Sequence, residues 1–258
     1  MAMLPIGLQL YSVRECCEED LPGTLKAVAE MGYAGVEFAG FYGRTAPELR
    51  AMLDDLGLKC CGTHIGIEHL LEDRLPATIE FMHTLGNRFL IVPGLPEERR
   101  NSRAAWLETA HLLNAVAAKL KPHGMQTGYH NHTVEFHPLD GEVPWDTFFG
   151  NTVPEVVMQF DTGNAMHEGV DAPFWLSKYP GRATTVHIKD WARENEGAII
   201  GEGETDWPRI FELCEGICKT EWYIVEQESP LYPPIMRVER CLDNLRKMGK
   251  WPPKPAAK

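Results

Sequence analysis

Two histidines, an amide and a carboxylate lie close together in residues 128–136. His130, Asn131 and His132 are consecutive, and Glu135 follows three positions later. Imidazoles bind metal ions and carry protons near neutral pH, and a carboxylate adds a hard oxygen ligand or a base. A histidine-rich strand end packed against a loop would have the same composition. The spacing indicates a metal or proton-transfer site if other strands also end in potential ligands.

Short apolar runs alternate with helical patterns along the chain, and a glycine closes several of the helical runs, as at Gly32, Gly57 and Gly86. A glycine at this point is typical of a helix C-terminus. The apolar runs predict strands at 4–10, 34–38, 58–64, 88–92, within 128–136, and at 156–161, 183–188 and 222–226. The patterns between them predict helices at 20–31, 46–56, 70–85, 102–120, 145–149, 172–177, 207–218 and 232–248.

This alternation predicts an α/β protein with a (β/α)8 TIM barrel. Strand–helix units with nearly continuous apolar strands are typical of a parallel sheet covered by helices. Eight such units in 258 residues match the usual size of the barrel. A doubly wound open sheet is the alternative, but no Gly-x-Gly-x-x-Gly follows the first strand, which disfavours its dinucleotide-binding form. We expect one domain over 1–258, with a short extended tail from about residue 250.

The charge and composition of the chain disfavour several classes of partner. The formal net charge of −12 repels phosphate backbones, so we expect no nucleic-acid partner. No apolar run approaches the roughly 20 residues that span a bilayer, and no export signal is visible. The seven cysteines form no C-x-x-C motif and are expected to be buried thiols in a reducing cytoplasm.

Polar residues recur where the predicted strands end, which is where barrel enzymes carry their catalytic groups. These residues are Glu37, His64, His130, Asp161, His187, Lys189 and Glu226. Carboxylates with imidazole and no thiolate suit Mn²⁺, Co²⁺, Mg²⁺ or Zn²⁺. The pattern therefore predicts a site for one divalent metal ion at the rim of the barrel.

Each ligand also has a structural alternative. Asp161 could cap the turn that follows it, and His187 could be a hydrogen-bonded core histidine. Glu226 follows an apolar run, so its charge needs a cation or a proton, and Lys189 could supply the cation. Because Asp161, His187 and Glu226 all lie at the ends of successive predicted strands, one common site is favoured over three separate structural roles.

Five motifs identify a family resemblance: Tyr129-His130-Asn131-His132-x-x-Glu135-Phe136, Phe160-Asp161-x-Gly163-Asn164, Val186-His187-Ile188-Lys189-Asp190, Gly201-Glu202-Gly203 with Asp206-Trp207, and Val225-Glu226-Gln227. With them the chain resembles, over essentially its whole length, the xylose-isomerase-like TIM barrels, the superfamily of sugar phosphate isomerases and epimerases. In that family an acid after strand five, an Asp, a His and a Glu hold a divalent metal. The resemblance implies Asp161, His187 and Glu226 as ligands.

The strand-five motif departs from the family pattern. Ketose epimerases have Glu-Asn-His where this chain has His130-Asn131-His132. We therefore expect Glu135 as the fourth ligand or as a base, in preference to His130. The His-x-His pair also resembles the inosose dehydratases of the same superfamily, which eliminate water from a keto-cyclitol.

The resemblance implies a divalent-metal-dependent isomerase or epimerase of a sugar or sugar phosphate, with Mn²⁺ as the expected metal. A proton beside a carbonyl is removed, and the metal stabilises the enediolate. The expected acid/base residues are Glu135 and Glu226, with His132 in reserve. The residues expected to bind substrate are Glu37, His64, His130, Asn131, Asn164 and Lys189. Lys189 could bind a phosphate or stabilise the enolate, or it could pair with Asp190 or Glu226.

Other activities remain open from the sequence. The first alternative is an inosose-dehydratase-like or keto-sugar lyase that eliminates water or a β-substituent. An endonuclease with three zinc ions is disfavoured by the acidic charge. A non-catalytic barrel is disfavoured by the strand-end acids. We expect a small sugar or keto-cyclitol substrate, no membrane partner, and a surface compatible with a homodimer.

Overall fold

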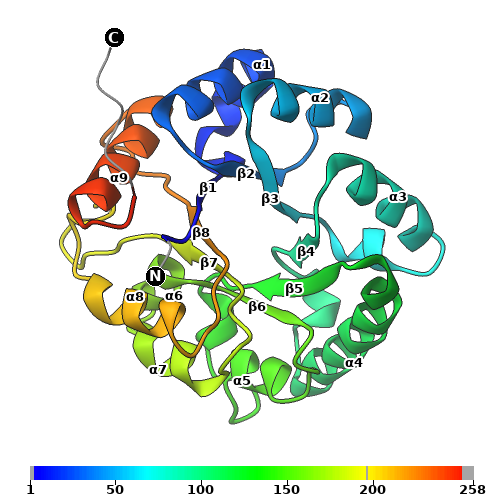
Figure 1. The fold of residues 1–258 in the computed structure, drawn as a ribbon. Helices are drawn as coiled ribbons and strands as arrows, with labels where there is room; N and C mark the ends of the chain where they lie inside the picture. The colour runs from blue at the N-terminus through cyan, green and yellow to red at the C-terminus, as the bar shows by residue number, and fades with distance from the viewer. Residues whose placement is uncertain (1–2, 196, 252–258) are drawn as a thin grey trace.

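Eight parallel strands close into a barrel in sequence order in this computed structural model, which describes residues 3–195 and 197–251 (Figure 1). The strands are β1 (Ile6–Gln9), β2 (Gly35–Ala39), β3 (Lys59–His64), β4 (Phe89–Val92), β5 (Gln126–His130), β6 (Val157–Asp161), β7 (Thr185–Ile188) and β8 (Trp222–Val225). Every strand pairs in parallel with both neighbours, and β1 pairs with β8 to close the barrel. The predicted (β/α)8 fold is confirmed.

The helices form a ring outside the strands (Figure 1). They are α1 (Arg14–Met31), α2 (Ala46–Leu56), α3 (Leu75–Leu85), α4 (Arg103–Leu120), α5 (Pro144–Phe149), α6 (Thr162–His167), α7 (Ala172–Lys178), α8 (Trp207–Glu215) and α9 (Pro234–Lys247). Short 3₁₀ turns lie at η1 (Leu10–Val13), η2 (Ile67–Leu70), η3 (Glu97–Arg99), η4 (Lys121–His123) and η5 (Val134–Phe136). None of the helices in the described part of the chain is long and apolar enough to cross a membrane.

Local sequence explains where α2 begins and ends. Thr45 and Glu48 form a capping box, in which the Glu48 carboxylate accepts from the Thr45 amide at 2.8 Å and from its hydroxyl at 2.7 Å. Gly57 ends the helix with a φ of 68°, a left-handed conformation that costs a glycine little. These start and stop signals make the alternation of strands and helices recognisable in the sequence.

The structure differs from the predicted elements at α1, α3, β5 and α6; helix α3 begins at Leu75, not at residue 70. Helix α1 begins at Arg14, not at residue 20. It is kinked at Asp20, where the predicted helix begins and where Asp20 Oδ1 accepts from the amide of Gly23 at 3.0 Å. Strand β5 ends at His130, and the 3₁₀ turn η5 follows within the predicted strand. The short helix α6 was not predicted. Residues 252–258, most of the predicted tail, lie outside the described residues.

The barrel interior contains polar side chains beneath the strand ends. Gln9, Glu37 and Gln159 are all fully buried. Barrel interiors are usually filled by branched apolar residues, and buried polar groups are costly unless bonded. Here Gln9 Nε2 and Gln159 Nε2 each donate to the Glu37 carboxylate at 2.8 Å. Because its hydrogen bonds are satisfied, this network of Gln9, Glu37 and Gln159 gives the side chains at the strand ends a fixed polar support.

Candidate active site and metal centre

Four buried side chains meet at the C-terminal ends of β5 to β8. They are His130, Asp161, His187 and Glu226, and one ligand atom of each lies within 4.8 Å of the others. Parallel register brings them together, since Asp161 pairs with His187 across β6 and β7. Two imidazoles and two carboxylates in a tight group form a hard nitrogen and oxygen donor set.

Two atoms of this group have no hydrogen-bond partner among the described residues, His130 Nδ1 and Asp161 Oδ2, and both are buried. The other oxygen of Asp161 accepts from the amide of Asn164 at 2.7 Å, so Asp161 also caps α6 as one sequence alternative proposed. A buried acceptor without a partner costs free energy. A divalent cation between the four side chains would satisfy both atoms. The residues present therefore fit a bound metal ion.

Glu37 holds the ring of His187 from below. The Nε2 atom of His187 lies 2.5 Å from Glu37 Oε2, and Nδ1 lies 2.9 Å from Glu226 Oε2. A carboxylate behind a ligating histidine fixes its tautomer and orientation and makes it a better ligand. This contact leaves Nδ1 facing the four-residue group.

The electrostatics of the group favour a positive charge at its centre. Burial disfavours a charged imidazole, but the carboxylates of Glu37 and Glu226 outweigh it and raise the pKa of His187 to about 10. Burial raises the pKa of Asp161 to about 6, although Lys189 opposes the shift. Burial also opposes ionisation of Glu226, but Lys189 and His187 hold its pKa well below the usual range. The carboxylates stabilise a cation between them, whether it is a proton or a metal ion.

Glu135 lies outside the group, in contrast to the sequence-based preference for it over His130. Its Oε1 accepts from the Tyr129 hydroxyl at 2.7 Å, and its Oε2 accepts from the amide of His132 at 2.8 Å. The cause is local: β5 ends at His130, and η5 turns the buried Glu135 back onto Tyr129. His130 takes the fourth position instead.

A cavity of about 320 Å³ opens beside the group. It is lined by Tyr11, Ala39, His64, Pro93, His130, His132, Asn164, Lys189, Glu226 and Glu228. Of the predicted substrate residues, Glu37 and Asn131 are not in its lining. Glu37 supports His187, and Asn131 bridges β5 to β6 because its Oδ1 accepts from the Asp161 amide at 2.8 Å.

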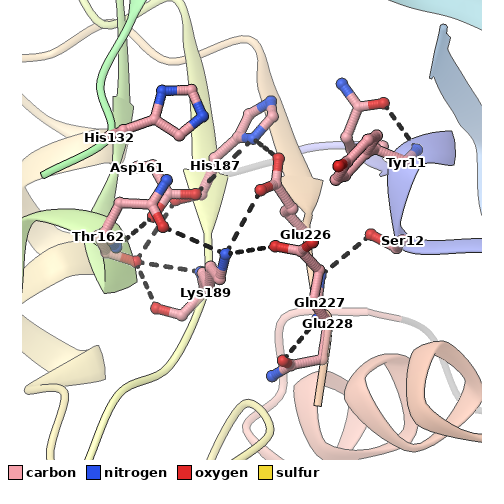
Figure 2. Close-up of polar contacts among 12 residues, drawn as sticks. Tyr11, Ser12, His132, Asp161, Thr162, His187, Lys189, Glu226, Gln227 and Glu228 are labelled. Carbon is pink, nitrogen blue, oxygen red and sulfur yellow. Dashed lines mark hydrogen bonds and ion pairs between the residues drawn. The ribbon is translucent and has the colours of Figure 1, made fainter. Parts of the chain in front are cut away.

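Lys189 connects the four-residue group to the cavity (Figure 2). Its Nζ lies 3.2 Å from Asn164 Oδ1, 3.4 Å from Glu226 Oε1 and 3.2 Å from Glu228 Oε2. Burial opposes the charge, but the carboxylates of Glu226 and Asp161 outweigh it and hold the pKa of Lys189 above its usual range. Lys189 therefore remains an ammonium ion, and the predicted pairing with Glu226 is present.

Sequence reasoning overlooked Tyr11 as a lining residue. It follows β1 in η1, where no acid or histidine marks the strand end. In the view of Figure 2, His187 and Glu226 lie between Tyr11 and His132. Including the first aromatic residue after each strand would have identified Tyr11.

Residues 25–248 match the sequence model of the xylose isomerase-like TIM barrel family. The chain belongs to this family. It is 27% identical to an inosose dehydratase of Geobacillus kaustophilus, a match that covers 82% of this chain and 84% of that protein. It is 26% identical to an inosose dehydratase of Erwinia tasmaniensis, over 89% of this chain and 90% of the relative. The crystal structure of a sugar phosphate isomerase/epimerase from Parabacteroides distasonis superposes with a TM-score of 0.82 at 25% identity, covering 95% of this chain and 98% of that one. The predicted membership of the xylose isomerase-like barrels is confirmed.

Proposed function

We propose that this xylose isomerase-like barrel is a divalent-metal-dependent dehydratase of a polyhydroxylated ketone. It removes a proton beside the carbonyl and expels a neighbouring hydroxyl as water. The curated relatives named inosose dehydratase support this class of reaction. Isomerisation or epimerisation of a sugar is the second candidate, supported by the likeness to the Parabacteroides protein.

The position of Glu135 supports dehydration over epimerisation. The resemblance to the ketose epimerases implies that epimerisation would use two metal-bound glutamates, one on each face of the sugar. Here Glu226 is the one glutamate in the four-residue group, and both oxygens of Glu135 are held by Tyr129 and the His132 amide. Elimination needs one base and one acid beside the carbonyl, and the cavity lining supplies both.

The metal would be held by His130, Asp161, His187 and Glu226, with Mn²⁺ as our first expectation and Co²⁺, Mg²⁺ or Zn²⁺ as alternatives. When bound, it acts as a Lewis acid that polarises the substrate carbonyl. Glu37 keeps the His187 ring in its ligating orientation through the bond to Nε2.

His132 is the proposed base. Its ring is exposed at the cavity and packs edge-on against His130, with the ring centroids 5.0 Å apart. A ring nitrogen of His132 takes the proton from the carbon beside the carbonyl. Glu226 is a poorer base, because Lys189 and His187 stabilise its ionised form against the effect of burial.

Lys189 is the proposed acid. Its ammonium group is held at the cavity by Asn164 and Glu228, from where Nζ donates a proton to the departing hydroxyl or a hydrogen bond to the oxygen that gains charge. Because its pKa is raised, Lys189 keeps its charge and cannot act as a base; of the two roles, the raised pKa favours the hydrogen bond over full proton transfer.

The test follows substrate mass in D₂O. Metal-loaded protein is incubated with keto-cyclitols and keto-sugars, and the products are analysed by mass spectrometry. Dehydration predicts a product lighter by one water. Deuterium uptake without loss of water would instead establish the isomerase or epimerase.

His132→Gln should slow the reaction by about 10²- to 10⁴-fold, the usual contribution of a general base. His137→Gln is the matched control, because His137 is exposed on the same loop but bonds Glu168 instead of lining the cavity. Equal activity of the two variants would refute the assignment of His132.

A further inference from the structure

We infer that the cavity takes a neutral, unphosphorylated substrate and excludes phosphate esters. This inference rests on the proposed function and adds a substrate class to it. It comes from the charged groups that line the cavity and from the partners each already has.

Lys189 is the one lysine or arginine among the described residues that line the cavity. An ammonium group has three hydrogens to donate, and three acceptors surround this one: Asn164 Oδ1, Glu226 Oε1 and Glu228 Oε2. A substrate oxygen can reach Lys189 by displacing Asn164 Oδ1, whereas a phosphate placed there would also face the carboxylates of Glu226 and Glu228.

The guanidinium of Arg14, which pairs with the lining residue Glu228, is also occupied. Its Nη1 lies 3.4 Å from Glu228 Oε1 and donates to the Tyr11 carbonyl at 3.0 Å, and its Nη2 lies 3.1 Å from Glu15 Oε1. The guanidinium carbon also lies 4.2 Å from the centroid of the Tyr11 ring. Arg14 is thereby held against the protein and not presented to the cavity.

The site has no excess positive charge for a substrate to neutralise. A divalent ion and Lys189 would supply three positive charges, against four negative charges on Glu37, Asp161, Glu226 and Glu228. A phosphate ester brings an extra charge of about −1.5 to −2 at pH 7 and would leave it beside Glu226 and Glu228. A substrate with an uncharged ring would leave the ion pairs of Lys189 with Glu226 and Glu228 intact.

The uncharged lining suits hydroxyl groups. Tyr11, His64 and His132 offer a phenol and two imidazoles that can donate or accept hydrogen bonds. The volume of about 320 Å³ lies at the lower end of the range for small-molecule sites. Both features match a single polyhydroxylated ring with no charged substituent.

Calorimetric titration of the metal-loaded protein tests the inference with inosose, fructose, fructose 6-phosphate and inorganic phosphate. We expect Kd values weaker than about 10 mM for the two phosphate compounds, and at least about 10-fold tighter binding of inosose. A Kd below about 1 mM for either phosphate compound would overturn the inference.

Glu228→Gln gives a second test, because it removes one carboxylate from Lys189 and from Arg14. It should improve the affinity for fructose 6-phosphate at least about 3-fold. Glu15→Gln is the control, since Glu15 pairs with Arg14 but not with Lys189, and it should leave that affinity unchanged. An equal gain in both variants would mean that general surface charge, not the cavity, excludes phosphate. If phosphate is excluded but no water is lost from any ketone, the proposed dehydration fails and the substrate charge class stands.

Discussion

Replacing Glu37 by glutamine should weaken metal binding although Glu37 is not a ligand. Glu37 is fully buried, and its Oε2 lies 2.5 Å from His187 Nε2. The substitution keeps the shape of the side chain and an oxygen that can accept from Nε2, but it removes the negative charge. The His187 ring then loses the charge that makes it a stronger ligand.

The magnitude follows from that contact. Losing a partner of this kind costs about 10- to 100-fold in metal affinity. Because glutamine retains the hydrogen bond, we expect the lower part of this range, about 10- to 30-fold, or roughly 1.4 to 2 kcal/mol of binding free energy.

Competition with a fluorescent chelator at several pH values, corrected for the proton that His187 must release, measures the affinity of the deprotonated site, and circular dichroism checks the fold. Calorimetry in two buffers of different ionisation enthalpy adds the number of protons released. That number should fall in Glu37→Gln, because the Glu37 carboxylate helps to raise the pKa of His187.

Glu135→Gln is the matched control. Glu135 is also a buried glutamate, but it lies in η5 and bonds Tyr129 and the His132 amide, not the four-residue group. We expect its metal affinity to stay within about 2-fold of the wild type. A folded Glu37→Gln protein with unchanged affinity would refute the reasoning, and a large loss in Glu135→Gln would restore Glu135 as a ligand.

Three further outcomes are expected. Metal affinity should rise with pH by up to about 10-fold per unit between pH 6.5 and 9, because the metal must displace the proton that His187 holds up to a pKa of about 10. The affinity should fall further below pH 6, because Asp161 is then protonated as well. Titrations at five pH values check this, and a flat profile would contradict it. Gly62→Ala should weaken metal binding and lower the free energy of unfolding by about 1–3 kcal/mol, because the added Cβ would meet the Glu37 carboxylate; an unaltered melting curve and affinity would argue against that contact. Asp190→Asn should destabilise the protein by about 2 kcal/mol or more in urea titrations, since its buried carboxylate accepts from backbone amides, a hydroxyl and an indole of the following loop; no loss would show that the loop holds without it.

The fold and part of the site could be read from the sequence for definite reasons. Strand ends in a closed parallel barrel converge, so Asp161, His187 and Glu226 could be grouped from their place in the repeat alone. The same logic supplied the divalent-metal expectation.

The rest depends on local geometry that spacing does not encode. A 3₁₀ turn after β5 decides that His130 and not Glu135 joins the group. The sequence pattern placed Glu37 at a strand end with the other candidate ligands, but it lies in the middle of β2, where the donors Gln9 and Gln159 hold it inside the barrel. The roles of Glu135 and Glu37 depend on the hydrogen-bond partners of each buried carboxylate. Some of those partners come from distant strands, which the linear sequence does not reveal.

The most direct test of the central claim is anomalous diffraction from crystals grown with Mn²⁺. We predict one strong peak between His130, Asp161, His187 and Glu226, with Glu135 still bonded to Tyr129. A peak ligated by Glu135 in place of His130, or no peak within this group, would contradict the proposed metal centre.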